Sequence, residues 1–169
     1  MPAAAVSRGA AMASCRQTGG PVLRTREGLQ MFDHEDPVLE LDETQCWTLL
    51  ESTGYGRIVL TAAGEVEIFP VNYRPHEGVL LLRTAPGTKL AALTVNANVL
   101  FEVDDVDGGG AWSVVVRGTA RILTGDQLEK AESLGLKTWV PTLKDFYVEI
   151  KPQRITGRHF NLGEQPERF

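Results

Sequence analysis

The residues with the clearest chemical potential lie in the stretch LLLRTAPGTKLAAL, residues 80–93. Three leucines typical of a buried strand lead into Arg83 and Thr84, and a Pro-Gly turn follows. Thr88 and Lys89 then open an apolar segment with a helical pattern. The sequence therefore gathers a guanidinium, two hydroxyls and an ammonium where a strand ends and a helix begins.

This combination of groups is suited to binding a phosphate. A helix N-terminus presents unpaired N–H groups and a partial positive charge, which stabilise an anion. Gly87 allows close backbone approach, while Arg83 and Lys89 add charged donors. The same residues also fit solvated charges beside a turn, and spacing alone leaves both interpretations open. The Walker spacing is absent, so the sequence gives no support for nucleotide hydrolysis.

A helix is predicted upstream, over LDETQCWTLLES, residues 41–52. Asp42 is a favoured N-cap residue, and Gln45 three positions later completes a capping box. Cys46 and the leucines at 49 and 50 recur on one face, and Gly54 ends the segment.

Short strands, rich in Val, Ile and Leu, follow this helix and are separated by the turn sequences AAGE, RPHEG and DGGG. Helical patterns are predicted between the third and fourth strands (87–96) and after the fifth (125–140). The strands are predicted at residues 56–61, 65–73, 78–84, 98–105, 111–123 and 145–157.

Six antiparallel strands with a few short helices predict a mainly β fold, namely a small closed barrel, because closure removes exposed strand edges. Residues 1–30 contain almost no large apolar side chains and show no period, so we expect a flexible N-terminal tail. Residues 31–169 are expected to form one domain.

Composition limits the classes of partner. The net charge of −5 and the pI near 5.2 argue against nucleic-acid and anionic-membrane binding, which need a basic surface. No apolar run reaches the length of about 18 residues that a membrane-spanning helix requires. The two cysteines and three histidines show no metal-site spacing, so no metal is expected and the cytoplasm is the default compartment.

Three motifs carry a resemblance to a known family: PVNY at 70–73, RTAPGTKL at 83–90 and WSVVVRG at 112–118. The chain is similar, over about residues 42–160, to the pyridoxamine 5'-phosphate oxidase-related FMN-binding split barrels, in their small bacterial branch. The resemblance implies a six-stranded split barrel, a homodimer, and an FMN in each of two grooves between the subunits.

The resemblance also implies roles for residues. Carried over by position, the FMN phosphate and ribityl chain would be held around Gly87 by Arg83, Thr84, Thr88 and Lys89. The isoalloxazine ring would be lined, partly through backbone groups, by Pro70, Val71, Asn72 and Tyr73. The neighbouring strand would bring Trp112, Ser113 and Val114 to the flavin, from the same or the partner subunit.

Tyr73 and Trp112 are equally consistent with core aromatic residues, and Asn72 within an apolar strand needs a polar partner if it is buried. The ending ITGR, common in the smaller branch, places Arg158 near the flavin or at the closure of the barrel. Thr88 stands where vitamin B6 oxidases commonly have a second arginine, so vitamin B6 oxidation is not the expected activity.

The expected function is therefore that of an FMN-binding oxidoreductase acting on a small molecule that the sequence does not identify, with no catalytic residue assigned. Two alternatives stay open. One is a reductase on the same fold that uses the deazaflavin F420, and the other is a non-catalytic flavin or haem protein that acts as a sensor or store.

Overall fold

The computed structural model of the protein describes residues 36–107, 110–140 and 143–164. The predicted tail, residues 1–30, lies outside these ranges and stays a prediction. The elements follow in the order β1 (Val38–Leu41), α1 (Glu43–Ser52), β2 (Tyr55–Ala62), β3 (Glu65–His76), β4 (Val79–Thr84), α2 (Thr88–Val95), β5 (Asn98–Asp107), β6 (Gly110–Ile122), α3 (Asp126–Ser133) and β7 (Phe146–Asn161).

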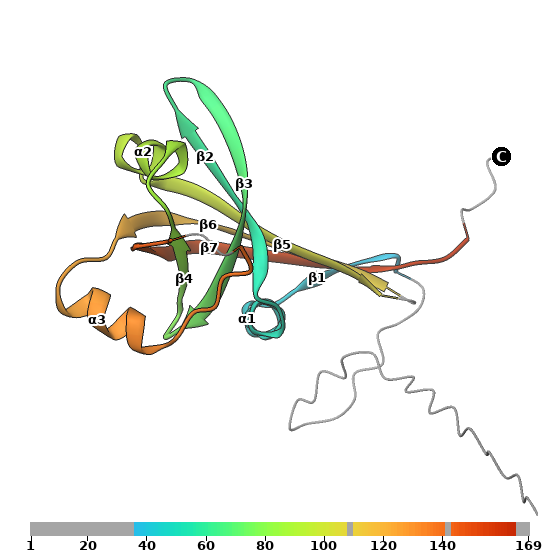
Figure 1. Cartoon of the computed structure of the whole chain (residues 1–169). Coiled ribbons are helices and arrows are strands. Elements are labelled where there is room, and N and C mark those ends of the chain that lie inside the picture. Colours follow the sequence, from blue (N-terminus) through green and yellow to red (C-terminus); the bar gives the residue numbers. More distant parts are fainter. Residues whose placement is uncertain (1–35, 108–109, 141–142, 165–169) are drawn as a thin grey trace, which may run out of the picture. The chain divides into compact units, whose positions relative to one another are not determined.

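The strands form one antiparallel sheet in the order β1-β7-β4-β3-β2-β5-β6. An additional pairing of β6 with β7 closes β2 to β7 into a barrel (Figure 1). The 16-residue β7 makes the split possible, because its first part pairs with β4 and its last part pairs with β1. The predicted mainly β split barrel is confirmed, and β1 is a further strand that the sequence did not reveal.

The barrel interior is filled by the alternating apolar side chains of the strands. Along β6, for example, Trp112, Val114 and Val116 are buried while the residues between them are more exposed. Phe101, at the centre of β5, is fully buried and meets the ring of Tyr73 edge-on, with the centroids 4.8 Å apart. This alternation gives every strand one face for the core and one for a site or a partner.

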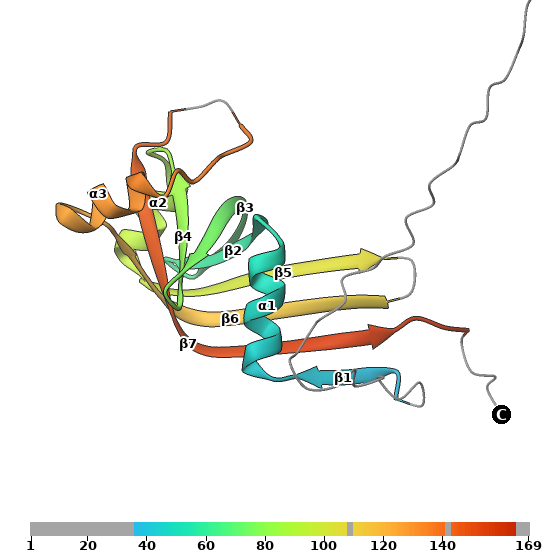
Figure 2. The same ribbon diagram turned by 90° about the horizontal axis from the view of Figure 1, so that it is seen from below.

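Helix α1 packs across β6 and β7 and places Cys46, Leu49 and Leu50 in the core (Figure 2). The predicted capping box is present: Gln45 N donates to Asp42 Oδ1 and Asp42 N donates to Gln45 Oε1, both at 2.8 Å. These two bonds satisfy N–H groups that the helix itself leaves open.

Helix α3 is shorter than predicted. It ends at Ser133, and Gly135 follows in the left-handed region at φ 63°. The described residues between 134 and 145 form no regular helix and lead into β7. No helix in the described ranges is long and apolar enough to span a membrane.

Candidate functional site

The predicted phosphate-binding residues gather at the junction of β4 and α2, as the sequence indicates. Arg83 is the penultimate residue of β4, and its Nε and Nη2 donate to the carbonyl oxygen of Lys144 at 3.1 and 2.7 Å. The guanidinium carbon also lies 5.0 Å from the ring centroid of Tyr147. These contacts tie the segment before β7 to β4 and use two of the five N–H groups of Arg83, so three remain for a ligand.

Lys89, in the first turn of α2, has an unfavourable surrounding for a positive charge. Burial and, secondly, the positive charge of Lys144 lower the pKa of Lys89 below the ordinary value of a lysine. Its Nζ lies 5.1 Å from the ring centroid of Phe69, a contact favourable to a cation. Within the described part of the chain Lys89 makes no ion pair. An anion placed here would stabilise the charged form of Lys89.

The N-terminus of α2 adds backbone donors to this cation cluster, which we define as Arg83, Lys89 and Lys144. The N-cap is Gly87, at φ 151°, where a side chain would be strained, and no side-chain hydrogen bond caps the helix. The first N–H groups of α2 thus keep the open character that favours an anion.

The two predicted threonines differ in their accessibility. Thr88 is exposed at the first position of α2. Thr84 is buried, and its hydroxyl donates to the carbonyl oxygen of Ala85 at 3.2 Å. Thr88 is therefore the more accessible hydroxyl for a phosphate.

Strand β3 separates the four residues of the PVNY motif onto two faces. Val71 and Tyr73 are 5% and 4% exposed in the core, and the Tyr73 hydroxyl donates to the carbonyl oxygen of Leu50 at 2.7 Å. Burial raises the pKa of Tyr73 to about 12. The side chains of Val71 and Tyr73 therefore face the core, and a cofactor contact through their backbone groups stays a prediction. Pro70 and Asn72 lie on the open face.

Asn72 finds its polar partners within the protein. Its Nδ2 donates to the carbonyl oxygen of Gly54 at 3.2 Å, and its Oδ1 accepts from the backbone N–H of Trp139 at 2.9 Å. The indole of Trp139 stacks on the ring of Tyr55, with centroids 5.0 Å apart and planes 7° from parallel. A flavin is therefore not needed to satisfy Asn72, which instead fixes an exposed aromatic pair beside β3.

Strand β6 divides its predicted residues in the same way. Trp112 and Val114 are 8% and 0% exposed in the core, so their side chains do not reach a surface ligand. Only Ser113 opens outward, into a pocket of about 430 Å³ on the outer face of β6 and β7. None of the cation cluster lines this pocket.

Sequence reasoning missed Lys144, Tyr55 and Trp139. Lys144 and Trp139 lie in the segment between α3 and β7, and long-range contacts alone bring them to β3 and β4. Trp139 fell within the predicted helix of residues 125–140, and Lys144 lay beyond its end, so neither gave a local signal of a site. Among the described residues, no group of three or more His, Cys, Asp or Glu side chains is arranged to hold a metal.

A family model described as pyridoxamine 5'-phosphate oxidase matches residues 42–159. The chain belongs to this family. Among curated proteins, this chain resembles Rv3129 of Mycobacterium tuberculosis H37Rv, with 42% identity over 53% of this chain and 82% of the relative. Rv0080 of the same organism is 35% identical over 71% of this chain and 84% of the relative.

Solved structures extend the comparison across the pyridoxamine 5'-phosphate oxidase family. A Corynebacterium glutamicum protein, provisionally named a pyridoxamine 5'-phosphate oxidase, has a TM-score of 0.71 at 47% identity and covers 78% of this chain and 98% of its own. An FAD-binding protein from Mycobacterium smegmatis has a TM-score of 0.60 at 40% identity, covering 73% and 98%. Another from Mesorhizobium loti has a TM-score of 0.64 at 25% identity, covering 72% and 97%.

Proposed function

We propose that this protein is a flavoprotein that binds FMN through the cation cluster and serves as an oxidoreductase for a small molecule. The observation that carries the proposal is the state of Lys89: a partly buried ammonium, close to Lys144, at a helix N-terminus without a side-chain cap. A phosphate would neutralise this charge and accept the N–H groups of α2.

The donor set fits the phosphate end of FMN. Lys89 would contribute a point charge, Arg83 its three remaining N–H groups, and Thr88 a hydroxyl. The open face of β3, with Pro70 and Asn72, runs on from there to the Tyr55–Trp139 stack, which is suited to a planar ring.

Bound flavin would supply hydride or electron transfer, and the protein would bind and orient it. Within the described ranges, neither Arg83 nor Lys89 forms an ion pair with a carboxylate. We therefore assign positioning and positive charge to the chain's own residues.

We further propose that the protein forms a homodimer in which the outer face of β6, with Ser113, meets the flavin of a second copy. This proposal rests on the resemblance to the family and on the division of β6 into a core face and an open face. Of the three predicted β6 residues, Ser113 is the one whose side chain would then meet the flavin.

The test is cofactor binding by the purified chain. We expect a yellow protein whose released chromophore has the mass of FMN, and a Kd for added FMN that rises at least tenfold in the Arg83→Ala/Lys89→Ala double variant. Arg121→Ala/Lys130→Ala removes the same charge from sites elsewhere and serves as the control. Equal FMN affinity in the folded double variant and the wild type would refute the cation cluster as the phosphate site.

FAD is a second candidate cofactor, because two solved relatives of 40% and 25% identity are named FAD-binding proteins. The same cluster would then hold the phosphate nearest the flavin. The mass of the released chromophore separates FMN, FAD and F420, and a bound flavin without turnover of any electron donor would favour the non-catalytic alternative.

A further inference from the structure

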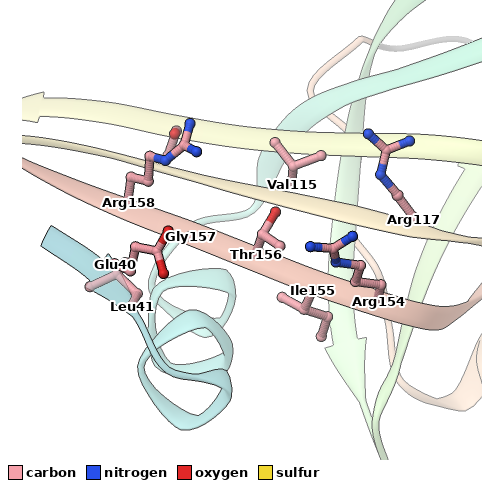
Figure 3. A pocket seen from close by; sticks show the side chains of 10 residues that line it. Glu40, Leu41, Val115, Arg117, Arg154, Ile155, Thr156, Gly157 and Arg158 are labelled. Carbon is pink, nitrogen blue, oxygen red and sulfur yellow. The ribbon is translucent and has the colours of Figure 1, made fainter. Parts of the chain in front are cut away.

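The outer face of β6 and β7 contains a pocket of about 430 Å³ with several arginines that have no role in the proposed FMN site (Figure 3). Arg117 on β6 and Arg154 on β7 form one end of it, and Arg158 with Glu40 forms the other (Figure 3). Val115 and Thr156 lie between the two ends. Both ends of the pocket are therefore polar, and among the residues that the structure describes no carboxylate lines the end formed by Arg117 and Arg154.

The pairing of the strands makes the Arg117–Arg154 end unusual. Arg117 and Arg154 are direct partners across β6 and β7, so two like charges face each other. Four residues further along β6, Arg121 is opposite Glu149 instead, and the two form an ion pair at 2.8 Å. Like charges directly opposite one another destabilise a sheet, whereas opposite charges stabilise it.

The carboxylates around the pocket lie beside or opposite other arginines. On β5, Glu102 and Asp104 both accept from Arg57, Glu102 at 2.7 Å. Glu40 on β1 is the direct register partner of Arg158. In the described part of the chain, Arg117 and Arg154 make no ion pair.

A β-bulge next to Arg117 sets this geometry. Arg117 pairs with Arg154, but Gly118 pairs with Pro152, so Gln153 is an extra residue in β7. Gly118 is required there, because a Cβ would lie 2.4 Å from the carbonyl oxygen of Lys151. Bulges commonly redirect side chains at functional sites. Here the bulge leaves two guanidinium groups on the same open face.

We infer that Arg117 and Arg154 form a second anion site, which binds the phosphate group of a phosphate ester. Two arginines can each present parallel N–H groups to phosphate oxygens, and the bound charge removes their mutual repulsion. The Thr156 hydroxyl lies on the same face, two residues along β7 from Arg154. The volume of the pocket suits a molecule of nucleotide size.

The phosphate has two sources that share this chemistry. It belongs either to a free small molecule of the AMP type or to the adenylate part of FAD bound by the chain or by a second copy. The first source is independent of the proposed function, and the second rests on it.

The experiment compares the full chain with Arg117→Gln/Arg154→Gln, using calorimetry at low salt with AMP and with pyrophosphate. Arg74→Gln/Arg121→Gln loses the same charge elsewhere and is the control. Lys89→Met is a third variant, because a phosphate probe also has the cation cluster available. The ratio of the FAD and FMN dissociation constants is measured for each protein.

A loss of AMP affinity of at least fivefold in Arg117→Gln/Arg154→Gln alone, with an unchanged FAD to FMN ratio, supports a site for free phosphate esters. A shift of that ratio toward FMN in the same variant supports the adenylate source. The inference is overturned if both quantities match the control, or if AMP binding is lost only in Lys89→Met. It is also overturned if the double variant changes only the dissociation of a dimer, since the arginines would then pair with a second copy.

Discussion

Lys89 is a partly buried ammonium whose neighbour, Lys144, is also positive. Burial and the nearby positive charge both disfavour the charged form of Lys89, whereas a bound phosphate would stabilise it. A charge-assisted hydrogen bond contributes about 1.5–3 kcal/mol. Lys89→Met should therefore weaken FMN binding by about tenfold or more, measured by quenching of flavin fluorescence. The matched control is Lys130→Met, in the last turn of α3, which should leave the affinity unchanged.

The lowered pKa of Lys89 also predicts how stability depends on pH. In the pH range just below the ordinary pKa of a lysine, the unfolded chain holds more protons at this position than the folded one. The free energy of unfolding should therefore rise with pH across that range, and this rise should be smaller in Lys89→Met. Urea denaturation at several pH values tests this. A rise of equal size in both proteins would contradict the assigned surroundings of Lys89.

Asn72, on β3, joins Gly54 and the segment before β7 through its two hydrogen bonds. Asn72→Ala should lower the free energy of unfolding by about 1–3 kcal/mol, since it removes both hydrogen bonds that the side chain makes to the backbone. Hydrogen exchange should increase at Trp139 and its described neighbours. Asn98→Ala removes only an exposed side-chain contact with Asn96 and should change stability by less than about 0.5 kcal/mol. Equal effects of the two substitutions would argue against a role of Asn72 in holding the segment before β7.

The PVNY motif shows what a sequence conveys at the residue scale. The resemblance grouped Pro70 to Tyr73 as one lining, yet a strand turns successive side chains to opposite faces. Val71 and Tyr73 consequently lie in the core, and Asn72 lies on the open face. The period of two allowed this division to be predicted, but which pair faces inward depends on the register with β2 and β4.

At the scale of elements, the strands and α1 could be predicted because their signals are local: alternation, turn residues and a capping box. Strand β1 was missed because it has four residues and pairs only with the distant end of β7. The segment before β7 was taken as helical because its apolar spacing continues that of α3. Gly135 ends that pattern, and the contacts with Arg83 and Asn72 then hold the chain.

The β-bulge between β6 and β7 depends on one glycine. Gly118→Ala would place a Cβ 2.4 Å from backbone, so we expect a loss of about 2–3 kcal/mol in the free energy of unfolding. Gly163→Ala is the control, because no atom lies within 4 Å of its added Cβ. Urea denaturation measures both. If Gly118→Ala were as stable as the wild type, the bulge would not be a tight constraint on the position of Arg117.

At the scale of the whole molecule, closure of β2 to β7 removes free strand edges from the barrel, so we expect the barrel to assemble through its faces. The outer face of β6 and β7 has a half-buried Val115 at its centre, with charged residues around it. If a second copy covers this face and shares the flavin, binding of FMN and dimerisation must strengthen each other, because each completes the site of the other.

This coupling gives the last prediction. Adding FMN should shift the sedimentation of the chain from the monomer of 18.5 kDa toward twice that mass at a fixed, low protein concentration. Val115→Lys would put an unpaired charge at the centre of the proposed interface, so both the dimer and the FMN affinity should weaken by at least tenfold. Val66→Lys, on the exposed β2–β3 hairpin, should affect neither. A dimer that is lost in Val66→Lys but kept in Val115→Lys would assign the interface to the hairpin, and FMN binding by a monomer would separate the cofactor site from assembly.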